Sequence, residues 1–200
     1  VAYQPKGAAD YAASKVNLVN SGTYGITDRT AYPSWDSSTG WSFNGSTQFL
    51  KTGYIPSVGA NLSVFVRAYQ NNVDTNNAQT VIGMHATSYP YNGVYIRFRS
   101  VGNTIDNRGA NDGISTTTVD KLLYDHVVGV AGREVFVDSL SESTFTDSTQ
   151  GFPSYDLYIG ALNYSSTIQF FSGYVYATAI YEGVLTSTQI SNLTTAMNAL

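Results

Sequence analysis

Apolar and polar residues alternate along most of the chain after residue 40, as in strands that bury one face. Clusters of Gly, Asn, Asp and Ser separate the alternating runs. The pattern predicts strands at about 41–44, 47–51, 62–70, 79–86, 93–100, 103–107, 114–118, 124–131, 134–138, 156–161 and 173–181. Two packed antiparallel sheets are expected to bury Val64, Val66, Ile96, Phe98, Val128, Val130, Phe136, Ile159 and Val175 between them.

The end of the chain changes from strand periodicity to helix periodicity. Residues 170–181 alternate, and the apolar residues that follow share one helical face: Ile190, Leu193 and Met197. Thr186 and Gln189 have the spacing of a capping box, and Leu185 is placed to form a hydrophobic staple with Ile190. We therefore expect one short C-terminal helix that is capped by Thr186 and docks through its apolar face.

The first forty residues lack strand periodicity. They are rich in Ala, Ser, Asn and Gly, and Ala8–Val19 is a candidate short helix. We expect one all-β domain over residues 1–200, a two-sheet antiparallel β-sandwich on which residues 1–40 pack as an irregular segment. Because the chain starts at Val1 and not at Met, we also expect it to be a piece of a longer protein.

Five segments follow one another in the order of a known fold. They are residues 41–53, which begin Trp41-Ser42-Phe43-Asn44-Gly45, residues 62–68, residues 125–130 with 135–139, residues 158–161 and residues 171–173. The series resembles the concanavalin A-like (laminin G-like) jelly-roll domains. This resemblance implies a jelly-roll sandwich that binds sugars or cell surfaces, with enzymes as a minority, and a structural role for His126.

The chain departs from that family at several positions. Tyr124 stands where the family has Trp, Ser139 where it has Gly, and Ala177 where the last strand has an acidic residue. The first forty residues are similar in style to domains of phage tail and virion-surface proteins. These departures weaken the transfer of individual functional residues from the family but leave the expected fold unchanged.

Composition excludes several classes of function. Charged residues make up 12% of the chain, the formal net charge is −4, and no basic run suits nucleic acid. No stretch reaches the roughly 18 apolar residues of a membrane-spanning helix. The absence of Cys excludes disulfides, thiolate nucleophiles and Cys-based zinc sites.

Motifs for catalysis are missing from the sequence. Only three Glu occur, Glu134, Glu142 and Glu182, and none lies in the Glu-x-Asp-x-Glu run of glucanases with this fold. No Gly-x-Ser-x-Gly motif is present, and His85 and His126 are the only His residues. The lyases of this fold need clustered Arg, Gln, His and Tyr, and this chain has no Gln-Ile-His tripeptide. We therefore expect that the chain is not an enzyme and that it requires no cofactor.

Two loops are candidates for a calcium site, and one of them carries Asp74, Asn76 and Asn77. The loop from Asp106 to Gly113 carries oxygen ligands, with Asp106 and Asp112 as candidate ligands, but lacks the spacing of a calcium-binding loop. The competing interpretation is a loop rich in Asx turns.

The candidate binding surface follows from strand alternation. If Val64, Val66, Ile96 and Phe98 face the core, the alternate positions on the same strands face outward. The predicted ligand-binding residues are these outward side chains and two loop tyrosines: Arg67, Tyr69, Tyr95, Arg97, Arg99, Tyr89 and Tyr91. Tyr rings suit stacking on sugars, and Arg donates to hydroxyls or carboxylates. The alternative is a solvated sheet with cross-strand cation–π pairs.

The leading hypothesis is a non-catalytic carbohydrate-binding or adhesion module of an extracellular, secreted or virion-surface protein. Its expected partner is a glycan or a cell-surface polysaccharide. One alternative is a structural phage virion or tail protein that packs against other virion proteins or its own copies. A second alternative is a polysaccharide lyase or glycoside hydrolase with an unrecognised site, and a third is a fragment of a larger adhesin.

Overall fold

The structure is a computed structural model of the chain. It describes residues 1–27, 31–57, 61–70, 79–86, 93–99, 104–108, 114–118, 125–144, 152–164 and 166–200. For Arg99, 104–108, 114–118 and 166–168 it describes the backbone and not the side chains. Over these ranges the chain consists mostly of strands, together with two helices, α1 (Tyr11–Ser14) and α2 (Ser187–Asn198).

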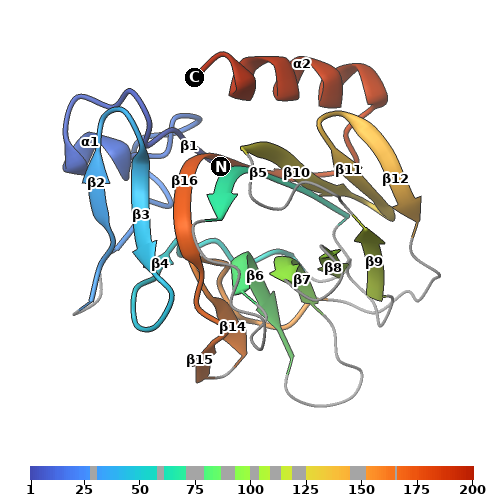
Figure 1. The fold of residues 1–200 in the computed structure, drawn as a ribbon, viewed down its shortest axis with the longest axis horizontal. Coiled ribbons are helices and arrows are strands. Elements are labelled where there is room, and N and C mark those ends of the chain that lie inside the picture. The colour runs from blue at the N-terminus through green and yellow to red at the C-terminus, as the bar shows by residue number, and fades with distance from the viewer. Residues whose placement is uncertain are drawn as a thin grey trace.

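The described strands form two sheets (Figure 1). In spatial order, sheet A contains β12 (Leu140–Thr144), β11 (Glu134–Val137), β10 (His126–Ala131), β5 (Leu62–Gln70), β16 (Ser172–Glu182), β3 (Gly40–Asn44) and β2 (Ser34–Asp36), and β1 (Ala2–Tyr3) also pairs with β16. Sheet B contains β15 (Ser166–Ile168), β14 (Leu162–Tyr164), β6 (Gln79–His85), β7 (Gly93–Arg99), β8 (Thr104–Arg108) and β9 (Ile114–Thr118), and β13 (Tyr158–Ile159) pairs with both β6 and β4 (Leu50–Lys51). The described pairs are antiparallel except that of β14 with β6.

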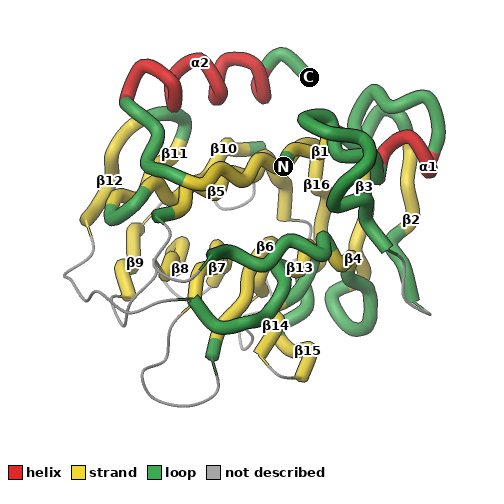
Figure 2. The backbone as a smooth tube through the Cα atoms, turned by 180° about the vertical axis from the view of Figure 1, so that it is seen from behind, coloured by secondary structure: helices red, strands yellow, loops and turns green. Residues whose placement is uncertain are grey.

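Three layers result, with α2 outermost, sheet A in the middle and sheet B on the far side (Figures 1 and 2). The alternation of side chains along β5 explains why sheet A is the middle layer. Val64 and Val66 belong to the core between the sheets, whereas Phe65 belongs to a second cluster beneath α2. The expected burial between the sheets is confirmed for these residues: Val64, Val66, Ile96, Phe98, Val128, Val130, Ile159 and Val175.

Phe136 is a correction to that expectation. It is buried, but it packs against Phe65 and the α2 cluster and not between the sheets. Its neighbours Val135 and Val137 take the inward positions of β11 instead. The predicted alternation along β11 is therefore correct, but the side chain that was expected to point between the sheets points towards α2.

The C-terminal helix has the predicted cap and docking face. The Thr186 hydroxyl accepts a hydrogen bond from the Gln189 backbone N–H at 3.3 Å, and the Gln189 side chain accepts one from the Thr186 N–H at 2.9 Å. Ile190 and Met197 are buried against sheet A, and Leu193 packs beside them. The capping box and the apolar helical face are thus confirmed.

The N-terminal segment differs from the prediction. It contributes β1 and β2 to sheet A, and the helix expected over Ala8–Val19 is only the four residues of α1. Asn17 explains the early end of this helix. Its side-chain oxygen accepts from the Ala2 N–H at 3.1 Å, and its amide donates to the Thr23 carbonyl at 3.2 Å. An Asn side chain that bonds to backbone groups competes with helix formation.

Candidate functional site

The predicted binding platform is divided between the two sheets. Arg67 and Tyr69 lie on β5 in sheet A, whereas Tyr95 and Arg97 lie on β7 in sheet B. The residues that alternate with them on each strand point into the core between the sheets. Arg67 and Tyr69 therefore lie on the outer face of sheet A, and Tyr95 and Arg97 lie on the outer face of sheet B. The interpretation that these four residues form one surface is therefore wrong.

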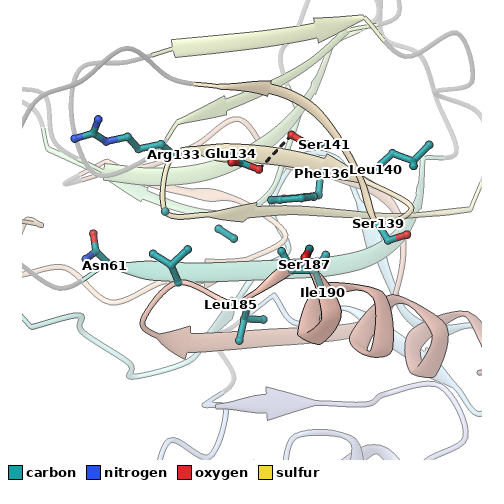
Figure 3. Close-up of a pocket in the computed structure, with 13 residues that line it drawn as sticks. Asn61, Arg133, Glu134, Phe136, Ser139, Leu140, Ser141, Leu185, Ser187 and Ile190 are labelled. Carbon is teal, nitrogen blue, oxygen red and sulfur yellow. Dashed lines mark hydrogen bonds between the residues drawn. The ribbon is translucent and has the colours of Figure 1, made fainter.

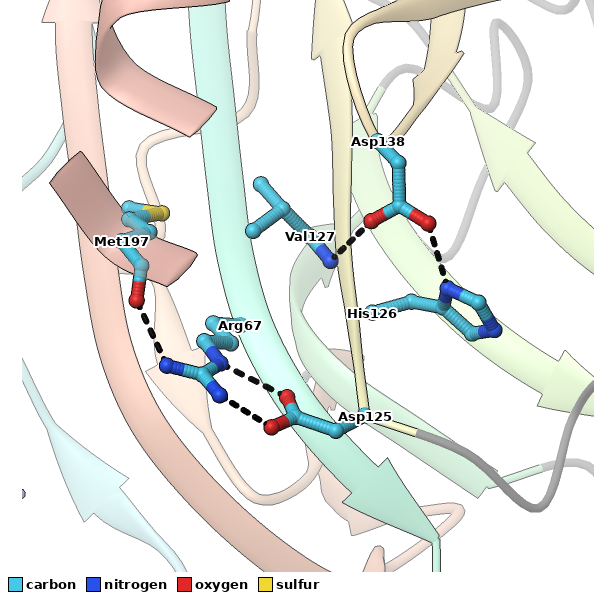
Figure 4. Close-up of polar contacts among 6 residues, drawn as sticks. All are labelled: Arg67, Asp125, His126, Val127, Asp138 and Met197. Carbon is cyan, nitrogen blue, oxygen red and sulfur yellow. Dashed lines mark hydrogen bonds and ion pairs between the residues drawn. The ribbon is translucent and has the colours of Figure 1, made fainter. Parts of the chain in front are cut away.

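Arg67 is enclosed beneath α2 (Figure 4). Its Nε donates to Asp125 Oδ1 at 2.7 Å, and a second nitrogen pairs with the other carboxylate oxygen. Its Nη1 donates to the Met197 backbone carbonyl at 2.7 Å, and its guanidinium lies 5.0 Å from the centre of the Tyr176 ring. Burial, followed by the charge of Asp125, raises the pKa of Tyr176. This network ties the last turn of α2 to sheet A.

His126 also belongs to a structural network. Its Nδ1 lies 2.6 Å from Asp138 Oδ2, and Asp138 Oδ1 accepts from the Val127 backbone N–H at 3.1 Å (Figure 4). The two contacts hold the start of β10 to the turn after β11. This geometry agrees with the structural role that the family resemblance implies for His126.

The outer face of sheet B gathers a different set of side chains. Strand register places four residues in one row across β4, β13, β6 and β7: Lys51, Tyr158, Gly83 and Tyr95. A Cβ at Gly83 would lie 2.4 Å from the Tyr95 Cβ and 3.1 Å from Leu162 Cδ1. Glycine at this point therefore leaves room for Tyr95 in the middle of the sheet.

Aromatic rings lie along this face in two neighbouring groups. His85 lies 6.0 Å from Tyr95 and 5.1 Å from Tyr164, measured between ring centres. Phe49 stacks on Tyr158 at 4.8 Å and also contacts Phe170 at 6.4 Å. The six rings form what we call the aromatic band: Phe49, His85, Tyr95, Tyr158, Tyr164 and Phe170.

Cations and hydrogen-bonding groups flank the aromatic band. The Arg97 guanidinium lies 4.8 Å from the centre of the Tyr95 ring, and the Lys51 ammonium lies 5.1 Å from that of Tyr158. Gln169 Oε1 accepts from Arg97 Nη1 at 3.3 Å and from the Thr80 hydroxyl at 3.1 Å. The band thus combines ring faces with donors and acceptors.

Exposure differs along the band. His85, Tyr95, Arg97 and Tyr158 are buried. The half-buried side chains lie towards β4 and β14: Phe49, Lys51, Tyr164, Gln169 and Phe170. A ligand that approaches sheet B would meet this half-buried rim first.

Sequence reasoning found Tyr95 and Arg97 but missed most of the band. The five missed rings come from different strands and connecting segments, and only strand pairing brings them together. Phe49 and Tyr158 lie in segments that resembled the family pattern and Phe170 adjoins one, which was the available signal. The remaining predicted residues are not placed. Tyr89, Tyr91 and Asp112 lie outside the described residues, and so do the side chains of Arg99 and Asp106.

Two further searches cover only the described part of the chain. It contains no group of three or more His, Cys, Asp or Glu side chains suited to a metal ion. Among its helices, none combines the length and the apolar character needed to cross a membrane. The predicted calcium ligands fall outside this search, so the calcium site stays a prediction.

Several solved structures share this fold. A Trypanosoma rangeli sialidase in complex with sialic acid matches with a TM-score of 0.63 and 14% identity, over 86% of this chain and 30% of the sialidase chain. The CBM40 carbohydrate-binding module of the Ruminococcus gnavus IT-sialidase matches with a TM-score of 0.55 and 10% identity, over 68% of this chain and 83% of the module. The same module bound to α2,3 sialyllactose gives a TM-score of 0.54 at 10% identity, with the same coverage.

Sequence comparisons add no relative, since no protein-family model and no curated protein matches the chain. At 10–14% identity, the structural likeness establishes the fold alone. The chain spans only 30% of the Trypanosoma rangeli sialidase.

These matches overturn the expectation that the chain is not an enzyme. That expectation rested on missing motifs of glucanases, lyases and serine hydrolases. Several of the matching structures are sialidases, which are enzymes, so the missing motifs do not exclude catalysis.

Proposed function

We propose that the chain binds carbohydrate through the aromatic band of sheet B. The observation that carries this proposal is the run of ring contacts on one sheet face, which ends in the half-buried rings of Phe49, Tyr164 and Phe170. Pyranose rings have apolar faces that pack on aromatic rings, and their hydroxyls need donors and acceptors at the edge. Gln169 and Lys51 provide such groups beside the rings.

The structural matches support this proposal. One of them is a carbohydrate-binding module bound to sialyllactose, and the chain matches 83% of that module. We also infer that the two sheets form a concanavalin A-like jelly roll, as the five sequence segments imply. The low charge of the chain and its 16 Tyr suit a glycan-binding module of an extracellular or virion-surface protein.

A second candidate function is glycoside hydrolysis, because several matching structures are sialidases. The outer face of sheet B also joins Arg97, His85 and Tyr95 with Gln169, groups that can bind an acidic sugar and move a proton. Incubation of the chain with 3′-sialyllactose, with release of free sialic acid as the readout, tests this candidate. Absence of release above a buffer blank would contradict it.

A glycan array tests the binding proposal. The wild-type chain should bind at least one glycan class, and Tyr164→Ala should weaken that binding several-fold, since one aromatic contact contributes roughly 0.5–1.5 kcal/mol. Tyr174→Ala is the matched control, because Tyr174 is a half-buried tyrosine that contacts Tyr69 on sheet A. Equal losses in both variants, or binding to no glycan, would contradict the proposal.

The array should be run with calcium and with chelator. Binding that persists in chelator would agree with a site made of aromatic side chains. Binding that is lost in chelator, but is unchanged in Tyr164→Ala, would move the site to the predicted calcium loop at Asp106 and Asp112.

A further inference from the structure

A separate pocket lies on the α2 side of sheet A (Figure 3), whereas the aromatic band lies on the outer face of sheet B. It has a volume of about 680 Å³ and lies between the first turn of α2 and the strands β11 and β12. This size falls within the roughly 300–1,000 Å³ of small-molecule sites. We call it the α2 pocket.

The frame of the α2 pocket is fixed by backbone hydrogen bonds. Gly183 N donates to the Asn61 carbonyl at 2.7 Å, and Gly132 N donates to the Leu62 carbonyl at 2.9 Å. The buried Ser63 hydroxyl donates to the Gly183 carbonyl at 2.8 Å and accepts from the next segment, at Leu185 N, at 3.0 Å. The pocket is therefore pre-formed, which favours specific binding.

The base and walls of the α2 pocket are apolar. Phe136 and Ile190 are buried at its base. Leu140 on one wall is 66% exposed and Val184 on the other is 55% exposed. Val184 lies beside Gly132 and Leu140 lies at the other end of β11, so each offers a separate apolar contact, and neither has the flat ring face of the aromatic band.

The rim of the α2 pocket is polar and carries both signs of charge. Asn61 offers an amide donor and acceptor, and the consecutive residues Arg133 and Glu134 carry opposite charges. The Glu134 carboxylate accepts from the Ser141 hydroxyl at 3.2 Å (Figure 3). Adjacent opposite charges favour an uncharged, polar ligand over a strongly charged one.

We infer that the α2 pocket binds the acetamido group of an N-acetylhexosamine. An acetamido group needs an apolar contact for its methyl, an acceptor for its N–H and a donor for its carbonyl. Val184 supplies the first, Glu134 the second and Asn61 the third, and all three lie at the end of the pocket beside the turn from β10 to β11. The inference takes only its ligand class, a glycan, from the proposed function, because its residues lie on the other side of sheet A from the aromatic band.

Calorimetric titration of the whole chain with triacetylchitotriose and cellotriose tests this inference. The two trisaccharides share their ring linkage and differ in the acetamido groups. Triacetylchitotriose should bind at least about tenfold more tightly, since a single apolar group in a pocket discriminates by that factor. Equal affinity, or no binding of triacetylchitotriose at millimolar concentration, would overturn the inference.

Variants then locate the site. Val184→Ser should weaken triacetylchitotriose binding several-fold, whereas Leu18→Ser, at a residue 60% exposed and not part of the α2 pocket, should leave it unchanged. Tyr164→Ala should also leave it unchanged. If Tyr164→Ala abolishes binding and Val184→Ser does not, the ligand lies on the aromatic band, so the inference fails while the proposed function survives.

Discussion

At the scale of single residues, Ser139 in the turn between β11 and β12 adds strain to the backbone. Asp138 and Ser139 have φ angles of 48° and 71°, in the left-handed region. Hairpin turns of this geometry favour Asp-Gly or Asn-Gly. The domains that the sequence resembles have Gly at this position, whereas Ser139 places a side chain in a backbone conformation that costs energy.

Ser139→Gly should therefore stabilise the chain. We expect the free energy of unfolding to rise by about 0.5–1 kcal/mol, because glycine adopts a positive φ without steric cost. Urea denaturation measures this change. Ser141→Gly in β12 is the control and should destabilise, since glycine weakens a strand. A lower urea midpoint for Ser139→Gly would contradict the account of the turn.

At the scale of elements, the cap of α2 could be predicted from the sequence, whereas its anchor on sheet A could not. Its cap rests on Thr186 and Gln189, three residues apart, so the sequence alone predicted it. Its anchor by Arg67 joins residues 130 positions apart, and the pair of Arg67 with Asp125 spans 58 positions. Contacts this distant depend on sheet order, which alternation does not reveal.

Thr186→Ala should lower the free energy of unfolding by about 1 kcal/mol, because it removes the side-chain acceptor of the helix N-terminus. Thr188→Ala, at an exposed site inside α2, is the control and should be neutral or slightly stabilising. The denaturant midpoints of the two variants test the cap. Identical midpoints would show that the cap does not contribute to stability.

Asp125→Asn should destabilise the chain more strongly than loss of the cap. It leaves the buried Arg67 without its charge partner. The expected loss is about 2 kcal/mol, below the roughly 3–5 kcal/mol of a fully buried pair, because the Asp125 side chain is 32% exposed. Hydrogen exchange should also speed up in the last turn of α2. Unchanged exchange there would contradict a role for this pair in docking α2.

At the scale of the whole molecule, the sequence predicted the layers better than the site. The core positions of β5, β7 and β10 followed from alternation, because a strand with one apolar face has few other ways to bury it. Alternation does not say which strands are neighbours. Arg67 and Tyr95 were therefore grouped wrongly, and the rings of Phe49 and Tyr164 were missed.

Buried tyrosines should make the fold sensitive to alkaline pH. Burial raises the pKa of Tyr3, whose hydroxyl donates to the Tyr24 carbonyl. Burial, with the hydrogen bond to Glu182, raises the pKa of Tyr54. Unfolded tyrosine titrates near pH 10. Above about pH 10 the unfolded chain holds fewer of these protons than the folded chain, so stability falls as pH rises.

The urea midpoint should accordingly drop between pH 9 and pH 11. Tyr3→Phe removes one of the titrating groups. The variant should be less stable at pH 7, by about 1 kcal/mol for the lost hydrogen bond. It should also lose less stability than wild type on the alkaline side. A steeper alkaline loss in Tyr3→Phe than in wild type would contradict this account.

The central claim is that glycan binds to sheet B, and an NMR titration with the best glycan from the array tests it most directly. Backbone amide shifts should change on β6, β7, β13 and β14, with Gly83, Tyr158 and Tyr164 among the most affected, while Tyr69 and Tyr174 on sheet A stay unchanged. Shifts confined to sheet A, or no shifts at saturating glycan, would contradict the claim.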